Sequence, residues 1–176
     1  MAVAVFNTPD IQGFAIATPM PNQHAVQIEA QFTKLPPGLH GFHIHKAGNL
    51  LLPGCAGACE HFHVGPHANH GGAPGDTLER HTGDLGNIYI ADEGGMFIAH
   101  YFINGIHVDD LWGRALIVHA DEDDLGIGNH YDSKTTGHSG KRIGCAIFGR
   151  LGDCNHPRKR PPRRQRRVTH KLASSK

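Results

Sequence analysis

Short stretches in which apolar and polar residues alternate recur along most of this chain, and they constrain its fold more than any other feature. Residues 24–34 are typical, since Val26, Ile28, Ala30 and Phe32 are apolar and the residues between them are polar. A period of two indicates a β-strand with one face against a core and one in water. Eight candidate strands cover residues 2–6, 12–19, 24–34, 39–45, 87–91, 95–101, 113–119 and 142–151. Because no apolar repeat with helical spacing exceeds about two turns, we predict an all-β fold, an eight-stranded antiparallel sandwich or barrel.

Two long segments interrupt the strand pattern. Residues 46–86 and 120–141 are rich in Gly, His and Asp. Loops of that length inside a compact domain usually carry function. A chain of 176 residues suits one domain of ordinary size. We therefore predict one globular domain over residues 1–154 with two functional loops, followed by a separate segment, residues 155–176.

The last segment differs sharply in charge from the rest of the chain. All 16 acidic residues lie at or before Asp153, whereas nine of the 17 basic residues lie within residues 158–176. Residues 1–157 therefore carry a net charge of −8 and the remainder +9. The segment has no periodic apolar residue, so we predict a disordered basic tail.

The tail has several candidate roles. Its charge would suit nucleic acid, an acidic protein or an anionic membrane surface, or a nuclear localisation signal. Without an aromatic residue to stack on bases, it is poorly suited to sequence-specific recognition. A solvated extension with no partner is an equally weighted alternative.

The N-terminal residues and the lack of a long apolar segment indicate a cytoplasmic protein. Its first residues, MAVAVFNTPDIQG, include no basic stretch followed by an apolar one, as a secretory signal requires. No segment approaches the roughly 20 apolar residues of a membrane span. We expect a soluble, cytoplasmic protein, with a nuclear fraction if the tail acts as an address.

The four cysteines are Cys55, Cys59, Cys145 and Cys154. In a reducing compartment such residues are ordinarily thiols or metal ligands. Their spacing does not match the paired CxxC motifs of a structural zinc site.

Histidine is unusually frequent, with 16 residues, of which 11 lie between His40 and His119. His43 and His45 close one candidate strand, and residues two apart on a strand project from the same face. They could offer two imidazoles to one ion. Taken alone, such a pair is more often a coincidence of the surface than a ligand pair.

The loop that follows adds further candidate ligands. They are His61, His63, His67, His70, His81 and Asp84. Imidazoles with one carboxylate suit Zn²⁺, and several imidazoles suit Cu²⁺. His119, at the end of another candidate strand, could complete the first site. The alternative is a set of solvated loop histidines.

At this point the motifs resemble the copper/zinc superoxide dismutase family from about residue 2 to residue 151. The matching stretches are GLHGFHIH at 38–45, GCAG at 54–57, HF at 61–62, RHTGDLGN at 80–87, VH at 118–119, DDLG at 123–126 and RIGC at 142–145. Several motifs in the family's order make the resemblance specific. It implies a Greek-key sandwich that disproportionates superoxide to dioxygen and hydrogen peroxide in antioxidant defence.

The resemblance implies one copper and one zinc per chain, with copper as the redox-cycling ion and zinc as the structural one. By the resemblance, His43, His45, His61 and His119 bind copper, whereas His61, His70, His81 and Asp84 bind zinc. His61 would bridge the two ions. His70 is preferred as the middle zinc ligand because it precedes Gly71 and Gly72, with His67 and then His63 as alternatives.

The resemblance also assigns residues around the metals. Asp123 would hydrogen-bond one histidine of each metal site, as outer partners of ligands commonly do. Cys55 and Cys145 match the family's disulfide, which replaces the interpretation of all four cysteines as thiols. Cys59 and Cys154 are then expected to be free thiols, with a second disulfide as the alternative.

Substrate guidance follows from the same comparison. Arg142 matches the family's guanidinium beside copper, where its planar fork can hold an anion. The alternative for Arg142 is an ordinary surface arginine. Lys134 and Thr136 lie where the family guides superoxide, although Lys134 is shifted by one place.

Family members of this type usually pair as homodimers, and we expect the same here. Two other classes of function compete with the enzyme. One is a non-enzymatic metal-binding relative with the same fold, and the other is a nucleic-acid-binding protein that acts through its tail.

Overall fold

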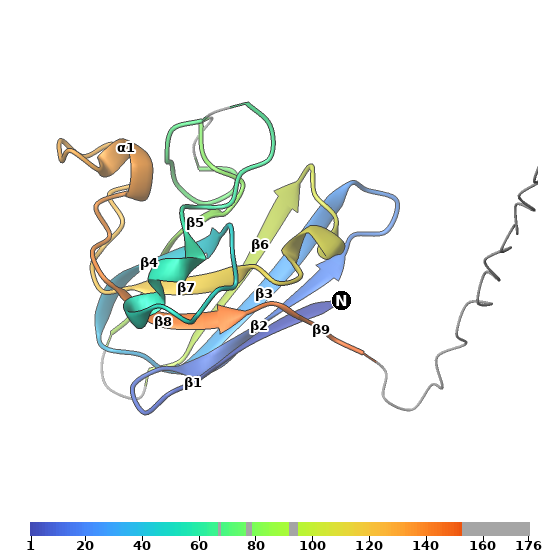
Figure 1. The fold of residues 1–176 in the computed structure, drawn as a ribbon, viewed down its shortest axis with the longest axis horizontal. Coiled ribbons are helices and arrows are strands. Elements are labelled where there is room, and N and C mark those ends of the chain that lie inside the picture. Colours follow the sequence, from blue (N-terminus) through green and yellow to red (C-terminus); the bar gives the residue numbers. More distant parts are fainter. Residues whose placement is uncertain (67, 77–78, 92–94, 153–176) are drawn as a thin grey trace, which may run out of the picture.

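A computed structural model describes residues 1–66, 68–76, 79–91 and 95–152. Within these residues, nine strands form two antiparallel sheets (Figure 1). The strands are β1 (Ala2–Asn7), β2 (Gln12–Pro19), β3 (Ala25–Lys34), β4 (Gly38–His45), β5 (Asp84–Ile90), β6 (Phe97–Asn104), β7 (Ala115–His119), β8 (Arg142–Ile147) and β9 (Gly149–Arg150). Their order is β6-β3-β2-β1-β9 in the first sheet and β5-β4-β7-β8 in the second. The predicted all-β sandwich is confirmed.

The core lies between the two sheets. Alternating residues of each strand are buried, as the strand patterns predict; in β1 these are Ala2, Ala4 and Phe6. Phe32 of β3 stands 5.1 Å from Phe6, centroid to centroid, and 5.6 Å from Phe42 of β4. Phe6 and Phe32 belong to the first sheet and Phe42 to the second, so the contact between Phe32 and Phe42 joins the two sheets face to face.

The last predicted strand, residues 142–151, is two strands rather than one. β8 pairs with β7 in the second sheet, whereas β9 pairs with β1 in the first. Phe148 stands between them and is 1% exposed. The chain therefore changes sheets at Phe148, a common way to make a corner in a sandwich. Because the buried–exposed alternation continues across the corner, the sequence pattern did not reveal it.

β5 also begins three residues earlier than the predicted strand 87–91. The extension follows from pairing, since Asp84 stands opposite His43 of β4 after a register shift. Asp84 is thus fixed by the sheet rather than carried by a mobile loop. The predicted strand 95–101 is shifted too, because β6 pairs with β3 along its whole length from Phe97 to Asn104.

The two long loops follow β4 and β7 in the chain, and both extend to the top of the molecule in the view of Figure 1. The first contains a 3-10 helix, η1 (Pro53–Ala58), and the second contains a single helical turn, α1 (Ser133–Thr136). A second 3-10 helix, η2 (Val108–Leu111), precedes β7. The expected disulfide joins Cys55 of η1 to Cys145 of β8 and so ties the first loop to the second sheet. Such a closure typically stabilises a fold by about 2–4 kcal/mol.

Cys59 is a free cysteine, as expected, whereas Cys154 and the tail lie outside the described residues. No helix in the described part of the chain is long and apolar enough to cross a membrane.

Candidate metal centre

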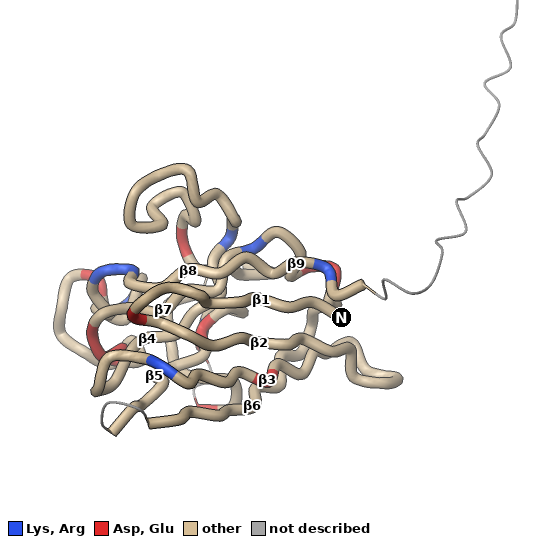
Figure 2. The backbone as a smooth tube through the Cα atoms, turned by 90° about the horizontal axis from the view of Figure 1, so that it is seen from below, with Lys and Arg blue, Asp and Glu red and all other residues tan. Residues whose placement is uncertain are grey.

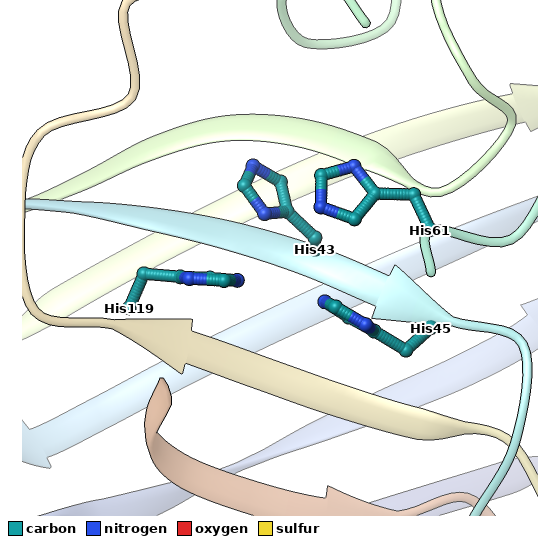
Figure 3. A group of neighbouring side chains, drawn as sticks. All are labelled: His43, His45, His61 and His119. Carbon is teal, nitrogen blue, oxygen red and sulfur yellow. The ribbon is translucent and has the colours of Figure 1, made fainter. Parts of the chain in front are cut away.

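Four histidines from three parts of the chain converge at one end of the second sheet (Figure 3). His43 and His45 lie on β4, and His119 ends the neighbouring strand β7. His61 comes from the first long loop and reaches β4 through an isolated bridge with His45. One ring nitrogen from each residue lies within 4.8 Å of the others, and all four residues are buried.

Each of these rings has one nitrogen held and one nitrogen unpartnered. The held atoms are His43 Nε2, His45 Nδ1, His61 Nδ1 and His119 Nδ1, which donate to Asp123 at 2.8 Å, the Cys59 carbonyl at 2.9 Å, Asp84 at 2.7 Å and the Gly140 carbonyl at 3.2 Å. The opposite nitrogens are buried and have no hydrogen-bond partner. A buried polar atom left unpaired costs about 1–3 kcal/mol. Several such atoms facing one another fit a metal ion that would accept their lone pairs.

Burial also sets the charge of these imidazoles. Desolvation lowers the pKa of His43, His45 and His61, and it lowers the pKa of His119 to about 4. The four rings are therefore neutral at pH 7. Neutral imidazole is the form that binds a metal.

A second group adjoins the first and shares His61 with it. It consists of His61, His70, His81 and Asp84, whose ligand atoms also lie within 4.8 Å of one another. Nδ1 of His70 is 3.1 Å from Asp84 Oδ1, and Nδ1 of His81 is 3.3 Å from Asp84 Oδ2. Three imidazoles and one carboxylate make a donor set that suits tetrahedral Zn²⁺.

Asp84 is the charged member of the second group. Burial acts to raise its pKa, but the three surrounding imidazoles outweigh burial and hold the pKa far below its usual value. The backbone N–H groups of Gly71 and His81 donate to Oδ2 at 3.0 and 2.7 Å. The carboxylate is thus ionised and fixed in direction before any ion arrives.

Asp123 connects the two groups. Its Oδ2 accepts from His43 Nε2 and its Oδ1 from His70 Nε2, both at 2.8 Å. The side chain is fully buried, and Asn87 holds its backbone through two hydrogen bonds of 2.8 Å. One carboxylate therefore orients a ring in each group.

His63 and His67 are the alternatives to His70 as the middle ligand of the second group. His63 has both ring nitrogens engaged, with the Pro66 carbonyl at 2.6 Å and the Thr82 N–H at 3.2 Å. It belongs to none of the ligand groups found among the described residues. His67 lies outside the described residues.

Arg142 stands beside the four-histidine group, opposite His119 in the pairing of β7 and β8. Its guanidinium donates to the carbonyls of Cys55 at 2.8 Å and Cys59 at 2.5 Å. It lines an open pocket of about 410 Å³ together with Lys141 and glycines of the two loops. The disulfide loop therefore holds a positive charge at the edge of the site.

Lys134 and Thr136 line a second pocket, of about 500 Å³, which reaches His61 and His81. Both residues belong to α1, where Lys134 is exposed and Thr136 half-buried. The structure thus places Arg142 and Lys134 at two different openings near the histidines.

Sequence reasoning missed Arg114, which supports the site from outside. Its guanidinium lies 3.8 Å from the centroid of the Phe62 ring and donates to the Lys46 carbonyl at 2.8 Å. Phe62 and Lys46 follow His61 and His45 directly. Arg114 thereby clamps the two segments that carry these histidines, and only the three-dimensional contacts reveal this role.

Zinc binding at the second group is expected to release about one proton at pH 7. Burial acts to lower the pKa of His70, but Asp123 and Asp84 outweigh burial and raise it to about 9. The metal-free protein therefore holds a proton on His70 that zinc must displace. Zinc affinity should rise roughly tenfold per pH unit from 7 to 9 and then level off.

The stability of the metal-free fold changes with pH in the opposite direction to zinc affinity. A raised pKa stabilises the metal-free fold fully below about pH 6.5, and this stabilisation is lost as the pH rises through about 9. Titration calorimetry in two buffers of different ionisation enthalpy measures the proton released by zinc. Zinc uptake at pH 7 without proton release would contradict the prediction.

Comparisons with known proteins point in one direction. A family model described as copper/zinc superoxide dismutase matches residues 11–148. A protein of Orgyia pseudotsugata multicapsid polyhedrosis virus named as a Cu-Zn superoxide dismutase is 46% identical over 127 residues, covering 70% of this chain and 81% of that protein. The Cu-Zn superoxide dismutase of Paramecium bursaria Chlorella virus 1 is 44% identical, covering 70% of this chain and 66% of its own length.

Two further relatives extend the comparison. The extracellular Cu-Zn superoxide dismutase of Haemonchus contortus is 44% identical over 128 residues, covering 72% of this chain and 68% of that protein. A crystal structure of the clock protein EA4 superposes with a TM-score of 0.74 at 35% identity, covering 84% of this chain and 92% of that one.

Proposed function

This chain belongs to the copper/zinc superoxide dismutase family, and we propose that the two histidine groups carry its reaction, the disproportionation of superoxide to dioxygen and hydrogen peroxide. We propose copper at His43, His45, His61 and His119, and zinc at His61, His70, His81 and Asp84. One observation supports this most. Of the seven buried side-chain nitrogens without a partner among the described residues, six belong to these two groups.

The residues divide the work between binding and proton transfer. When bound, copper supplies one-electron redox chemistry, while zinc, which has none, organises the ligands. Asp84 holds His61 by Nδ1, at 2.7 Å, so its Nε2 faces the copper group. His61 is therefore placed to hold a proton at Nε2, the kind of proton that the peroxide product needs.

Arg142 supplies the positive charge for binding an anion. Residues 1–157 carry −8, which on its own would repel superoxide. A cation fixed at the edge of the site offsets this locally, as is known for superoxide dismutase, which serves as the reference case for such steering. The carbonyls of Cys55 and Cys59 hold the guanidinium in place.

Replacing Arg142 with alanine is therefore expected to lower kcat/KM for superoxide about tenfold at low ionic strength, with both metals still bound. The assay is dismutation by the metal-loaded protein, with copper and zinc counted per chain. Arg150→Ala, on strand β9, is the matched control because it removes the same charge outside both pockets. A wild-type protein fully loaded with metals but without dismutase activity would sink the proposal and favour a metal-binding role.

We also propose that the chain forms a homodimer through exposed apolar residues near β8. Leu51 is 91% exposed, Leu52 52% and Val5 of β1 59%. Leu51 and Leu52 directly precede η1, and both η1 and β1 lie against β8. Apolar residues gathered in this way often mark a protein interface. In a sedimentation experiment, we expect the full chain at twice the monomer mass and the Leu51→Glu variant at the monomer mass.

For the basic tail, residues 155–176, we propose an anionic partner, either nucleic acid or an acidic protein, and a cytoplasmic location with a nuclear fraction. The support is its nine basic residues without an acidic one. Deleting the tail should leave dismutation within about twofold, since the metal groups lie elsewhere. The deletion should also abolish binding to duplex DNA. In the full chain, the logarithm of the binding constant should fall with the logarithm of salt concentration, with a slope of about −0.9 per phosphate contact. Cell fractionation of the tagged full chain tests the location. Loss of dismutation when the tail is deleted would contradict the expectation that the metal groups work without the tail.

A further inference from the structure

The few basic residues of the domain are distributed unevenly. Residues 1–157 contain eight, and four of them, Lys46, Lys134, Lys141 and Arg142, line the two pockets beside the histidines. Strands β1, β2 and β6 carry no charged residue at all (Figure 2). Against an acidic background, the positive charges therefore gather where an anion would enter. Lys46 and Lys141 have no role assigned above, and of these two only Lys46 lines the pocket that reaches His61.

The backbone fixes Lys46 close to the copper group. Lys46 directly follows His45, and Glu60 directly precedes His61. The Lys46 N–H donates to the Glu60 carbonyl at 2.9 Å, next to the bridge that joins His45 and His61. Arg114 holds the Lys46 carbonyl from the other side. Both side chains thus start from anchored backbone and line the 500 Å³ pocket that reaches His61.

The two side chains form an ion pair, Lys46 Nζ with Glu60 Oε2. They remain 48% and 80% exposed, respectively. Such exposed pairs contribute little to stability, so holding the fold together is a weak explanation for charges at this place. What the pair does change is the field in the pocket, because Glu60 cancels much of the attraction that Lys46 exerts on an anion.

We propose that Lys46 is a further specificity residue that attracts superoxide into this pocket, and that Glu60 attenuates it. The inference rests on the proposed function of the two histidine groups. It adds a third guiding cation on the β4 side of the site, separate from Arg142 and from Lys134 of α1.

The test compares Glu60→Gln, Lys46→Gln and the double variant as metal-loaded proteins, with superoxide generated by pulse radiolysis at ionic strengths of roughly 0.01 and 0.5 M. At low salt, Glu60→Gln should raise the second-order rate constant about twofold and Lys46→Gln should lower it about two- to threefold. The double variant should lie close to the wild type, and its difference from Glu60→Gln isolates Lys46. At high salt the differences should shrink, since the Debye length falls from about 30 Å toward 3 Å.

Two controls separate a local effect from a change of net charge. Glu29→Gln and Lys34→Gln make the same charge changes on β3, outside both pockets, and should alter the rate by less than about a quarter of the change at the paired site. Thermal midpoints of all variants should match the wild type.

The possible failures are distinguishable. If Lys46→Gln and Lys34→Gln lower the rate equally, or if Lys46→Gln leaves it unchanged at low salt, the role of Lys46 is overturned while the enzyme stands. A fully metal-loaded wild type without activity would instead overturn the proposed function itself.

Discussion

Replacing His61 with alanine should lower dismutase activity by more than 100-fold and reduce the content of both metals. His61 is the one residue that belongs to both ligand groups. Removing a residue that only hydrogen-bonds a ligand lowers metal affinity or activity about 10–100-fold. Losing a ligand that both groups share should lower them further. The variant also leaves Asp84 without the 2.7 Å hydrogen bond from Nδ1. Dismutation rate and metal content per chain, measured on the same sample, test the expectation.

His63→Ala is the matched control for this experiment. His63 lies two residues away in the same loop and lines the same pocket as His61. Its ring nitrogens contact the Pro66 carbonyl and the Thr82 N–H rather than a ligand group. The control should keep both metals and most of the activity. Equal loss in the two variants would mean that the loop's conformation, not a shared ligand, had been tested.

Much of the fold could be predicted from the sequence because its determinants are local. Alternation in stretches such as Val26–Phe32 follows from one buried and one wet face, and the structure confirms it in β3. The corner at Phe148 could not be predicted, because alternation is the same whether the partner strand is β7 or β1. Partner choice depends on the packing of the whole sandwich.

The site shows the same division. His43 and His45 could be paired from their spacing on one strand, since that spacing alone fixes their common face. Residue type and spacing also suggested the other ligand candidates, but only the family resemblance divided them between two ions. Lys46, Glu60 and Arg114 had no recognisable motif, because their roles arise from contacts between segments up to 68 residues apart.

Replacing Asp123 with asparagine should weaken metal binding about 10–100-fold at one of the two groups, as loss of an outer partner commonly does. The carboxylate accepts from His43 Nε2 and from His70 Nε2 at the same time. An asparagine has a single acceptor oxygen and a donating amide, so it can satisfy only one of the two rings. The N–H of the other histidine ring would then point at the amide N–H of the asparagine, and that ring would turn out of position. Asp123→Ala, which removes both acceptors, should weaken binding at both groups.

Competition titrations with chelators measure each affinity, and the absorption spectrum of bound copper reports whether His43 has turned. Glu122→Gln is the control, because Glu122 is adjacent but exposed. The pKa of His70 offers a second readout in the metal-free protein, since Asp123 is among the groups that raise it to about 9, and it should fall in both variants. Unchanged affinities together with an unchanged His70 pKa would show that the metal groups do not depend on this carboxylate. A fall in affinity confined to one metal in Asp123→Asn, and shared by both in Asp123→Ala, would show that one buried side chain couples the redox ion to its structural neighbour.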